Sequence, residues 1–341
     1  MSTFVLDSLE VPIVVAPMAG GPSTPELVIA AAQAGGMGFL AGGYKSAGQL
    51  REQIDTVRAA TDRPFGVNVF VPEADAPLDT AALDDFAQRL ALEAERLHVE
   101  IPTPRPDDDH WDDKIDLLVE AAVPVVSFTF GLPPRAVVSD LHDAGSAVFV
   151  TVTTPRDARA AVARGVDALV VQGHEAGGHR STFSASQEPE PTPLVDLLEK
   201  VRAVTTLPLI GAGGIGSTAD VRRALDAGAT AVQVGTLFLP AVEAGTARTY
   251  RDALQEMRLA STCVTRAFSG RPARGLRNSF IAAHHRWAPA IYPQVNQLTA
   301  PLRAAAMTRG DRQNISLYAG TGHQMAQPGT TAQIMERLWP R

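Results

Sequence analysis

Eight short apolar runs separated by amphipathic stretches constrain the fold of this chain most strongly. The runs are continuous rather than alternating and rich in β-branched residues, as is typical of parallel strands buried on both faces. They occupy residues 13–16, 38–41, 65–69, 123–127, 147–151, 168–171, 207–210 and 230–234. Eight strand–helix units predict an α/β protein with a (β/α)8 barrel (TIM barrel), and a doubly wound open sheet is the structural alternative.

The stretches between the runs have the periodicity and stop signals of helices. Amphipathic segments lie at residues 25–34, 46–60, 133–144, 155–164, 191–204 and 218–227. Four segments end at a glycine just before the next strand, namely Gly35, Gly145, Gly165 and Gly228. Glycine accepts the left-handed conformation that commonly ends a helix.

Two segments depart from this rhythm. Residues 72–118 are too long for one connection, and we expect an excursion over the barrel mouth, helical over 81–97. Its acidic turn, Asp107–Asp109, is interpreted as solvated surface rather than as a metal site. For residues 239–319 the sequence predicts a mostly helical extension that caps the barrel. We therefore expect a barrel domain at 1–242, on which 320–341 pack back, and a helical cap and substrate domain at 243–319.

Composition narrows the class of protein. Of 341 residues, 45% are hydrophobic, which is enough for a large core, and the net charge of −7 argues against a nucleic-acid partner. The single cysteine, Cys263, cannot form an intrachain disulfide and is interpreted as a packing residue. No apolar stretch approaches the ~20 residues of a membrane span. The first residues lack the pattern of a signal peptide, so a cytoplasmic location without membrane contact is expected.

The run Gln172–Arg180 follows the sixth predicted strand and contains three glycines and two histidines. Glycines let a backbone approach a ligand, and a histidine at the end of a barrel strand is placed to exchange a proton. A tight turn with a solvated histidine is the alternative. His174 and His179 are five residues apart, whereas zinc proteases need a spacing of four on one helical face, so we expect no metal.

Two glycine-rich loops follow the last two strands, at Gly211–Ser217 and Gln233–Thr236. In barrels these loops commonly bind a phosphate through backbone N–H groups; tight turns alone are the alternative. Asn68 and Gln172 end otherwise apolar strands, which favours a ligand over packing. The first loop, Ala16–Gly21, would bring backbone beside a flat ring.

These residues resemble the nitronate monooxygenases, formerly called 2-nitropropane dioxygenases, which are FMN-dependent (β/α)8 enzymes. The matching motifs extend over nearly the whole chain: Ala16–Gly21, Pro64–Asn68, Ser127–Pro133, Gln172–Arg180, Gly211–Ile215, Gln233–Thr236, Phe268–Gly275 and Tyr318–Gly320. The last two motifs resemble the class I branch. Class I relatives usually carry histidine where this chain has Thr129, so a second active-site imidazole is missing.

The resemblance implies a set of site residues. FMN would be held by Ala16, Pro17, Met18, Ala19, Asn68, Gln172, Gly177, Gly178, Gly213, Gly214, Gln233, Val234, Gly235 and Thr236. The substrate would be lined by Gly20, Thr129, His179, Tyr292 and Tyr318, although core packing is an equal alternative for the two tyrosines. His179 would be the catalytic histidine. It would act as base on a neutral nitroalkane, or orient an anionic nitronate if it is protonated or donates a hydrogen bond.

The activity implied is oxidation of alkyl nitronates, such as propionate 3-nitronate, by O2 to a carbonyl product and nitrite. The partners would be the nitronate and O2, and a homodimer is left open. Two other readings remain. An FMN-dependent NAD(P)H:quinone or enoyl-thioester reductase on the same barrel would oxidise NAD(P)H. A barrel that only binds a phosphate ligand would be colourless when purified.

Overall fold

The computed structural model describes residues 5–73, 78–257 and 260–340. Its eight parallel barrel strands close in the order β1-β2-β3-β4-β5-β6-β8-β9, with β9 paired back onto β1. The strands are β1 Ile13–Val15, β2 Met37–Ala41, β3 Gly66–Phe70, β4 Val125–Thr129, β5 Ala147–Val152, β6 Ala168–Gln172, β8 Leu209–Ala212 and β9 Ala231–Val234. All eight predicted runs are confirmed as strands. Closure of the sheet excludes the open-sheet alternative.

Helices cover the outside of the barrel where the sequence predicts them. They are α1 Pro25–Gln33, α2 Ala47–Ala60, α6 Arg135–Asp143, α7 Pro155–Arg164, α8 Leu194–Arg202 and α9 Thr218–Asp226. Ser46 caps α2 and forms a reciprocal capping box with Gln49. The four predicted glycine stops all have positive φ, between 86° and 97°, which confirms their role in ending helices.

The inside of the barrel is a packed core rather than a channel. Phe39 and Phe149 lie across it with ring centroids 6.5 Å apart, and Val14, Val125 and Ile210 pack with them. A larger apolar cluster fills the space between the strands and the outer helices. Because the interior is filled, a ligand site has to lie at the ends of the strands, among the loops.

The segment after β9 is less helical than predicted. It contains α10 Arg248–Glu256, β10 Thr262–Thr265, β11 Ala273–Leu276, α11 Ser279–His284 and α12 Gln294–Thr308. Strands β10 and β11 pair antiparallel, and β11 also pairs with β7, Gly178–His179, from the glycine-rich loop after β6. These strands have at most four residues, and β7 lies almost a hundred residues before its partner β11 in the sequence. Local periodicity therefore did not reveal them.

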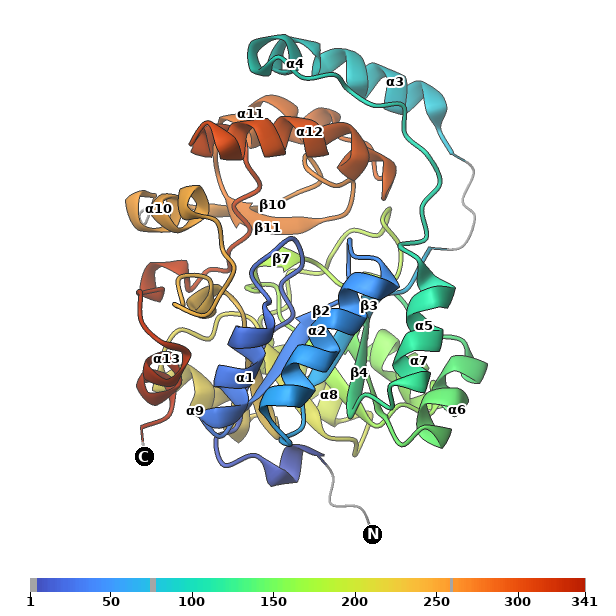
Figure 1. Ribbon diagram of the computed structural model, residues 1–341, viewed down its shortest axis with the longest axis vertical. Coiled ribbons are helices and arrows are strands. Elements are labelled where there is room, and N and C mark those ends of the chain that lie inside the picture. Colours follow the sequence, from blue (N-terminus) through green and yellow to red (C-terminus); the bar gives the residue numbers. More distant parts are fainter. Residues whose placement is uncertain (1–4, 74–77, 258–259, 341) are drawn as a thin grey trace.

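The excursion between β3 and β4 does not lie where the sequence suggested. It forms α3 Thr80–Arg89, α4 Ala91–Leu97 and α5 Trp111–Glu120, while residues 74–77 lie outside the described residues. Helices α3 and α4 pack on α12, on the outer side of the extension, rather than over the barrel mouth (Figure 1). Phe86 and Leu90 share an apolar cluster with Leu298 and Leu302 of α12.

The acidic turn is partly exposed, as predicted. Asp107 and Asp108 are exposed, whereas Asp109 accepts a hydrogen bond from the backbone of Tyr44 and lies 2.7 Å from the buried Lys114 ammonium. Cys263, on β10, is half-buried against the apolar cluster of the extension, in agreement with a packing role.

The end of the chain returns to the barrel. Helix α13, Thr331–Leu338, packs against α1 and α9. Short 3-10 helices complete the fold at Val5–Ser8, Thr236–Phe238, His285–Trp287, Arg312–Asn314 and His323–Met325. Among the described residues, no helix combines the length and apolarity needed to cross a membrane. The domain boundaries at residues 242 and 319 stay a prediction.

Candidate active site

A cavity of about 620 Å³ lies at the carboxyl ends of the barrel strands, beneath the extension. Its volume falls within the range of about 300–1,000 Å³ typical of cofactor and ligand sites. Every residue predicted to contact cofactor or substrate lines it except Tyr292. The structure therefore brings the predicted set together, while the role of each residue in binding stays a prediction.

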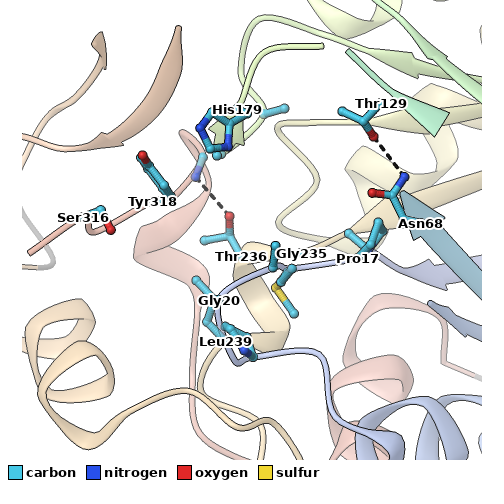
Figure 2. A pocket seen from close by; sticks show the side chains of 18 of the residues that line it. Pro17, Gly20, Asn68, Thr129, His179, Gly235, Thr236, Leu239, Ser316 and Tyr318 are labelled. Atoms are coloured by element: carbon cyan, nitrogen blue, oxygen red, sulfur yellow. Dashed lines mark hydrogen bonds between the residues drawn. The ribbon is translucent and has the colours of Figure 1, made fainter. Parts of the chain in front are cut away.

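Asn68, at the end of β3, is held in one orientation (Figure 2). Its side-chain nitrogen lies 2.9 Å from the Thr129 hydroxyl, 2.9 Å from the Ser127 hydroxyl and 3.1 Å from the Ser127 carbonyl oxygen. An amide nitrogen has two hydrogens, so these acceptors saturate it and leave Oδ1 as the acceptor available to a ligand. The hydroxyl of Thr129 is thus one of the groups that orient Asn68.

Gln172, at the end of β6, uses both ends of its amide on the glycine-rich loop. Its Nε2 donates to the carbonyl oxygen of His179 at 2.9 Å, and its Oε1 accepts from the N–H of Ser181 at 2.9 Å. These bonds fix the backbone around His179. The predicted contact of Gln172 with a cofactor is not tested by this arrangement.

The loops after β8 and β9 present unpaired backbone donors. Among the described residues, the N–H groups of Gly213, Gly214 and Gly235 have no acceptor. Gly213 has a φ of 111°, and a Cβ there would lie 2.7 Å from the nitrogen of Ala176. Successive N–H groups in this conformation form a concave anion site, so the arrangement fits a phosphate.

His179 is positioned by the extension. Its strand, β7, pairs with β11 opposite Ala273, and the next residue donates its N–H to the carbonyl of Pro272 at 2.7 Å. The imidazole Nε2 lies 2.8 Å from the hydroxyl of Ser269, in the β10–β11 connection. The ring lies 5.3 Å from Tyr318 between centroids (Figure 2). Backbone pairing and side-chain contacts together leave His179 little conformational freedom.

His179 is neutral at physiological pH. Burial, followed by the nearby cations of Arg271 and Arg303, lowers its pKa from the ordinary 6.5 to about 3. A protonated imidazole, one of the two ways in which the sequence analysis allowed this residue to bind an anion, is therefore disfavoured. A neutral ring can accept a proton or donate one hydrogen bond.

The lowered pKa of His179 predicts a pH-dependent stability. The unfolded chain binds a proton below pH 6.5, while the folded ring does so only near pH 3, so this contribution is complete above pH 6.5 and is lost as the pH falls toward 3. Between pH 7 and 4.5, the wild type should lose about 2.5 kcal/mol more free energy of unfolding than His179→Asn. Urea denaturation of both proteins at the two pH values measures this, and equal losses would refute the buried neutral ring.

Arg303 is a cavity residue that the sequence analysis missed. Among the described residues that line the cavity, it is the only side chain charged at neutral pH, and no carboxylate accompanies it. Its Nη2 donates to Asn296 Oδ1 at 2.7 Å and its Nε to Thr299 Oγ1 at 3.2 Å, while Nη1 has no partner in the described chain. One cation held in this way suits an anionic ligand. Asn296, Ala300 and Arg303 are spaced so that they share one face of a helix, which was the signal that the sequence offered. The sequence alone does not show that this face points toward the barrel.

Tyr292 stands behind the cavity wall. Its ring lies 5.6 Å from Phe130 and 6.3 Å from His179, between centroids, and its hydroxyl lies 3.5 Å from that of Tyr44, which does line the cavity. Tyr318 lines the cavity directly, and burial raises its pKa to about 12, so its phenol stays protonated. Tyr44 is a second lining residue that the sequence analysis missed.

His174 and Glu175, in the glycine-rich loop after β6, contact each other and the backbone rather than a metal ion. The Glu175 carboxylate accepts from the N–H of Leu194 and lies 3.4 Å from His174 Nδ1. Within the described ranges, no group of three or more His, Cys, Asp or Glu side chains is placed to hold a metal ion.

Comparison with known proteins places this site in a family. The family model "Nitronate monooxygenase" matches residues 2–340. A probable nitronate monooxygenase of Staphylococcus aureus strain Newman is 35% identical over 335 residues, which cover 97% of this chain and 94% of that protein. Among solved structures, nitroalkane oxidase from Streptomyces ansochromogenes is 44% identical with a TM-score of 0.94, covering 98% and 96% of the two chains. FabK from Thermotoga maritima is 28% identical with a TM-score of 0.75, covering 99% and 95%.

The similarity to this family extends from the barrel through the extension that carries Ser269 and Arg303. The family model and the relative from Staphylococcus aureus both cover almost the entire chain. This chain therefore belongs to the nitronate monooxygenase family and is an enzyme of the flavin-dependent oxidoreductase class.

Proposed function

We propose that this enzyme binds FMN without a covalent link and oxidises alkyl nitronates with O2, giving a carbonyl product and nitrite. The observation that carries the proposal is the charge of the cavity: among the described residues its lining holds one cation, Arg303, no carboxylate and a neutral His179. A nitronate is a small anion, and it is complementary to such a cavity. A cytoplasmic location and a homodimer stay predictions.

The residues present fit FMN. The unpaired N–H groups of Gly213, Gly214 and Gly235 would hold its phosphate, and the free Oδ1 of Asn68 would accept from the flavin ring. The Gln233 amide also lines the cavity and has no hydrogen-bond partner among the described residues. When bound, FMN would take electrons from the substrate and pass them to oxygen.

Protein groups would position the substrate beside the flavin. Arg303 would attract the nitronate, while the rings of Phe130 and Tyr318, both on the lining, would exclude water around it. The solved relative named nitroalkane oxidase supports a neutral nitroalkane as a second substrate. In that case the neutral imidazole of His179 would take the proton.

A reductase is the second candidate. The similarity to FabK at a TM-score of 0.75 supports a shared scaffold, but it is weaker than the similarity to nitroalkane oxidase at 0.94. A reductase of the NAD(P)H:quinone or enoyl-thioester type would need NADH or NADPH to reduce the flavin. Rapid oxidation of either nicotinamide by the purified protein would favour it.

The proposal is tested by product and cofactor analysis. The purified protein should release FMN on denaturation, identified by its mass, and should convert propionate 3-nitronate and O2 into nitrite. Release of FAD would refute the cofactor assignment. Absence of nitrite, with FMN bound, would refute the reaction.

Replacing Gly213 by Ala should weaken FMN binding. The added Cβ would meet the nitrogen of Ala176 at 2.7 Å, and the φ of 111° disfavours any L side chain. Strain of about 1–3 kcal/mol would displace the loop and raise the FMN dissociation constant by about 5- to 150-fold. Fluorescence titration of the apoprotein with FMN measures this.

Gly145→Ala is the matched control. Gly145 also has positive φ, 86°, but nothing lies within 4 Å of its Cβ position, and it ends α6 away from the cavity. This variant should lose stability but keep the wild-type affinity for FMN. Equal FMN affinity in both variants would contradict a phosphate site at Gly213.

A further inference from the structure

Ser269 contacts both the imidazole of His179 and the backbone of Arg271. It lies in the turn between β10 and β11 and is 1% exposed. Its hydroxyl oxygen lies 2.8 Å from His179 Nε2, 3.3 Å from the carbonyl oxygen of Arg271 and 3.3 Å from the backbone nitrogen of Arg271. The turn is closed by the N–H groups of Ser269 and Gly270, both donating to the carbonyl of Arg266.

Besides these three neighbours, the Ser269 side chain hydrogen-bonds the phenol of Tyr318. The single hydroxyl hydrogen of Ser269 is therefore directed toward Tyr318 and the carbonyl of Arg271, and the chemistry of the remaining contacts determines which way the bond to His179 runs. A carbonyl oxygen only accepts and a backbone N–H only donates, while a hydroxyl has one hydrogen and two lone pairs. If the Ser269 hydroxyl donates to the carbonyl of Arg271, it accepts from the N–H of Arg271 and from His179. All three contacts are satisfied together only when His179 carries its proton on Nε2.

The other ring nitrogen is then a free base. His179 Nδ1 has no hydrogen-bond partner among the described residues. Because it is also absent from their buried atoms that lack a partner, it is accessible, and it faces the cavity that His179 lines. In the Nε2–H tautomer, Nδ1 carries a lone pair and can accept a proton. The opposite tautomer would present an N–H to the cavity instead.

We propose that Ser269 is a positioning residue that keeps the proton of His179 on Nε2 and so presents Nδ1 to the cavity as a base for neutral nitroalkanes. This inference rests on the proposed function and adds to it a residue that positions the base. Ser269 would act through His179 without touching the substrate.

In the proposed step, the proton passes from the α carbon of the nitroalkane to His179. The α C–H bond of the nitroalkane breaks, its electron pair becomes the C=N bond of the nitronate, and the proton forms an N–H bond at Nδ1. The resulting imidazolium still donates from Nε2 to Ser269. The hydroxyl of Ser269 keeps its own hydrogen, which stays hydrogen-bonded to the carbonyl of Arg271. The proton returns to water after product release, and oxidation of the nitronate then follows as proposed above.

The charges that face the ring are consistent with this role. Arg271 and Arg303 both lower the pKa of His179, so an isolated imidazolium is disfavoured there. A nitronate formed at the ring supplies the opposite charge and favours the protonated form while it is bound. The fully buried Arg271 is itself paired with Glu73 at 2.8 Å, and no carboxylate lines the cavity in the part of the chain that the structure describes.

The test compares one neutral substrate with its own anion. For Ser269→Ala holoenzyme, kcat/KM for nitroethane should fall about 10- to 100-fold, the range found when a partner that orients a ligating histidine is removed. For preformed ethyl nitronate, which needs no proton transfer, the fall should stay within about threefold. Ser269→Thr restores the hydroxyl and should bring the ratio of the two values back toward that of the wild type.

Ser181→Ala is the matched control. Ser181 is also fully buried, and its hydroxyl bonds backbone groups of Phe130 and Thr151 in the same region without contacting the imidazole. Any loss in this variant should affect both substrates by the same factor. Equal losses for both substrates in Ser269→Ala would overturn the inference, because they would show general disruption.

A second measurement needs no variant. In wild-type holoenzyme labelled with 15N-histidine, the spectrum of His179, assigned by comparison with His179→Asn, should show a protonated Nε2 and an unprotonated Nδ1 at pH 7. A proton on Nδ1 would overturn the inference. Wild-type enzyme that oxidises ethyl nitronate but not nitroethane would also overturn it, yet would leave the proposed function standing. Failure with both substrates would instead refute the proposed function.

Discussion

Replacing His179 by asparagine should lower kcat/KM for a neutral nitroalkane by about 10²- to 10⁴-fold, the usual contribution of a general base. The loss for a preformed nitronate should be smaller, about five- to tenfold, because one hydrogen bond is removed but no proton needs to be taken. Arg303 remains in place to attract the anion. Steady-state oxygen consumption with both substrates measures the two effects.

The variant should keep its flavin. The strand that carries residue 179 is held by backbone pairing with β11 and by Gln172, which bonds the carbonyl oxygen of residue 179 rather than its side chain. The loops at Gly213 and Gly235, which we propose to hold the phosphate, do not contact the imidazole by hydrogen bonds. Flavin absorbance per protein should therefore match that of the wild type.

His98→Asn is the control for this substitution. His98 is exposed at the end of α4 with a φ of 51°, a left-handed conformation that asparagine tolerates. This variant should have wild-type activity with both substrates. Undiminished activity of His179→Asn with both substrates would remove His179 from the catalytic centre and contradict the assignment.

Arg303→Met should raise the KM for a nitronate and reduce kcat/KM by about 10- to 100-fold, because a hydrogen bond to a charged group contributes about 1.5–3 kcal/mol. Methionine keeps much of the apolar volume but removes the only charge among the described lining residues. The same change should raise the pKa of His179, since the Arg303 cation helps to lower it. Arg303→Lys, which keeps the charge, should recover part of the loss.

Arg248→Met is the matched control for the loss of one positive charge. The Arg248 side chain is 94% exposed on α10, where it pairs with Asp252. An effect of net charge alone would appear in both variants, whereas binding at the cavity would appear only in Arg303→Met. An unchanged KM in Arg303→Met would contradict the role of this cation.

The barrel could be predicted from the sequence because each of its signals is local. A buried parallel strand such as Ala168–Gln172 is apolar along its whole length, and a helix end such as Gly165 is marked by one residue. Which surface an amphipathic helix covers depends on its partner. Helices α3 and α4 therefore could not be assigned to α12 from their own periodicity.

The residues of the candidate site likewise fall into those with a local signal in the sequence and those without one. Gly213 and Asn68 could be singled out because their residue types are unusual directly after apolar strands. Ser269 and Arg303 could not, since Ser269 meets His179 across 90 residues of sequence and Arg303 lines the cavity with the ends of the barrel strands only in the folded chain. Thr129, predicted to line the substrate, does line the cavity, and its hydroxyl also holds Asn68, a contact that the sequence could not indicate.

The most direct test of the central claim is to mix the flavin-loaded protein anaerobically with propionate 3-nitronate and, separately, with NADH and NADPH, while recording flavin absorbance. The proposed function predicts rapid loss of the oxidised flavin spectrum with the nitronate and no change with either nicotinamide. Reduction of the flavin by NADH or NADPH, with no response to the nitronate, would contradict it and identify the enzyme as a reductase.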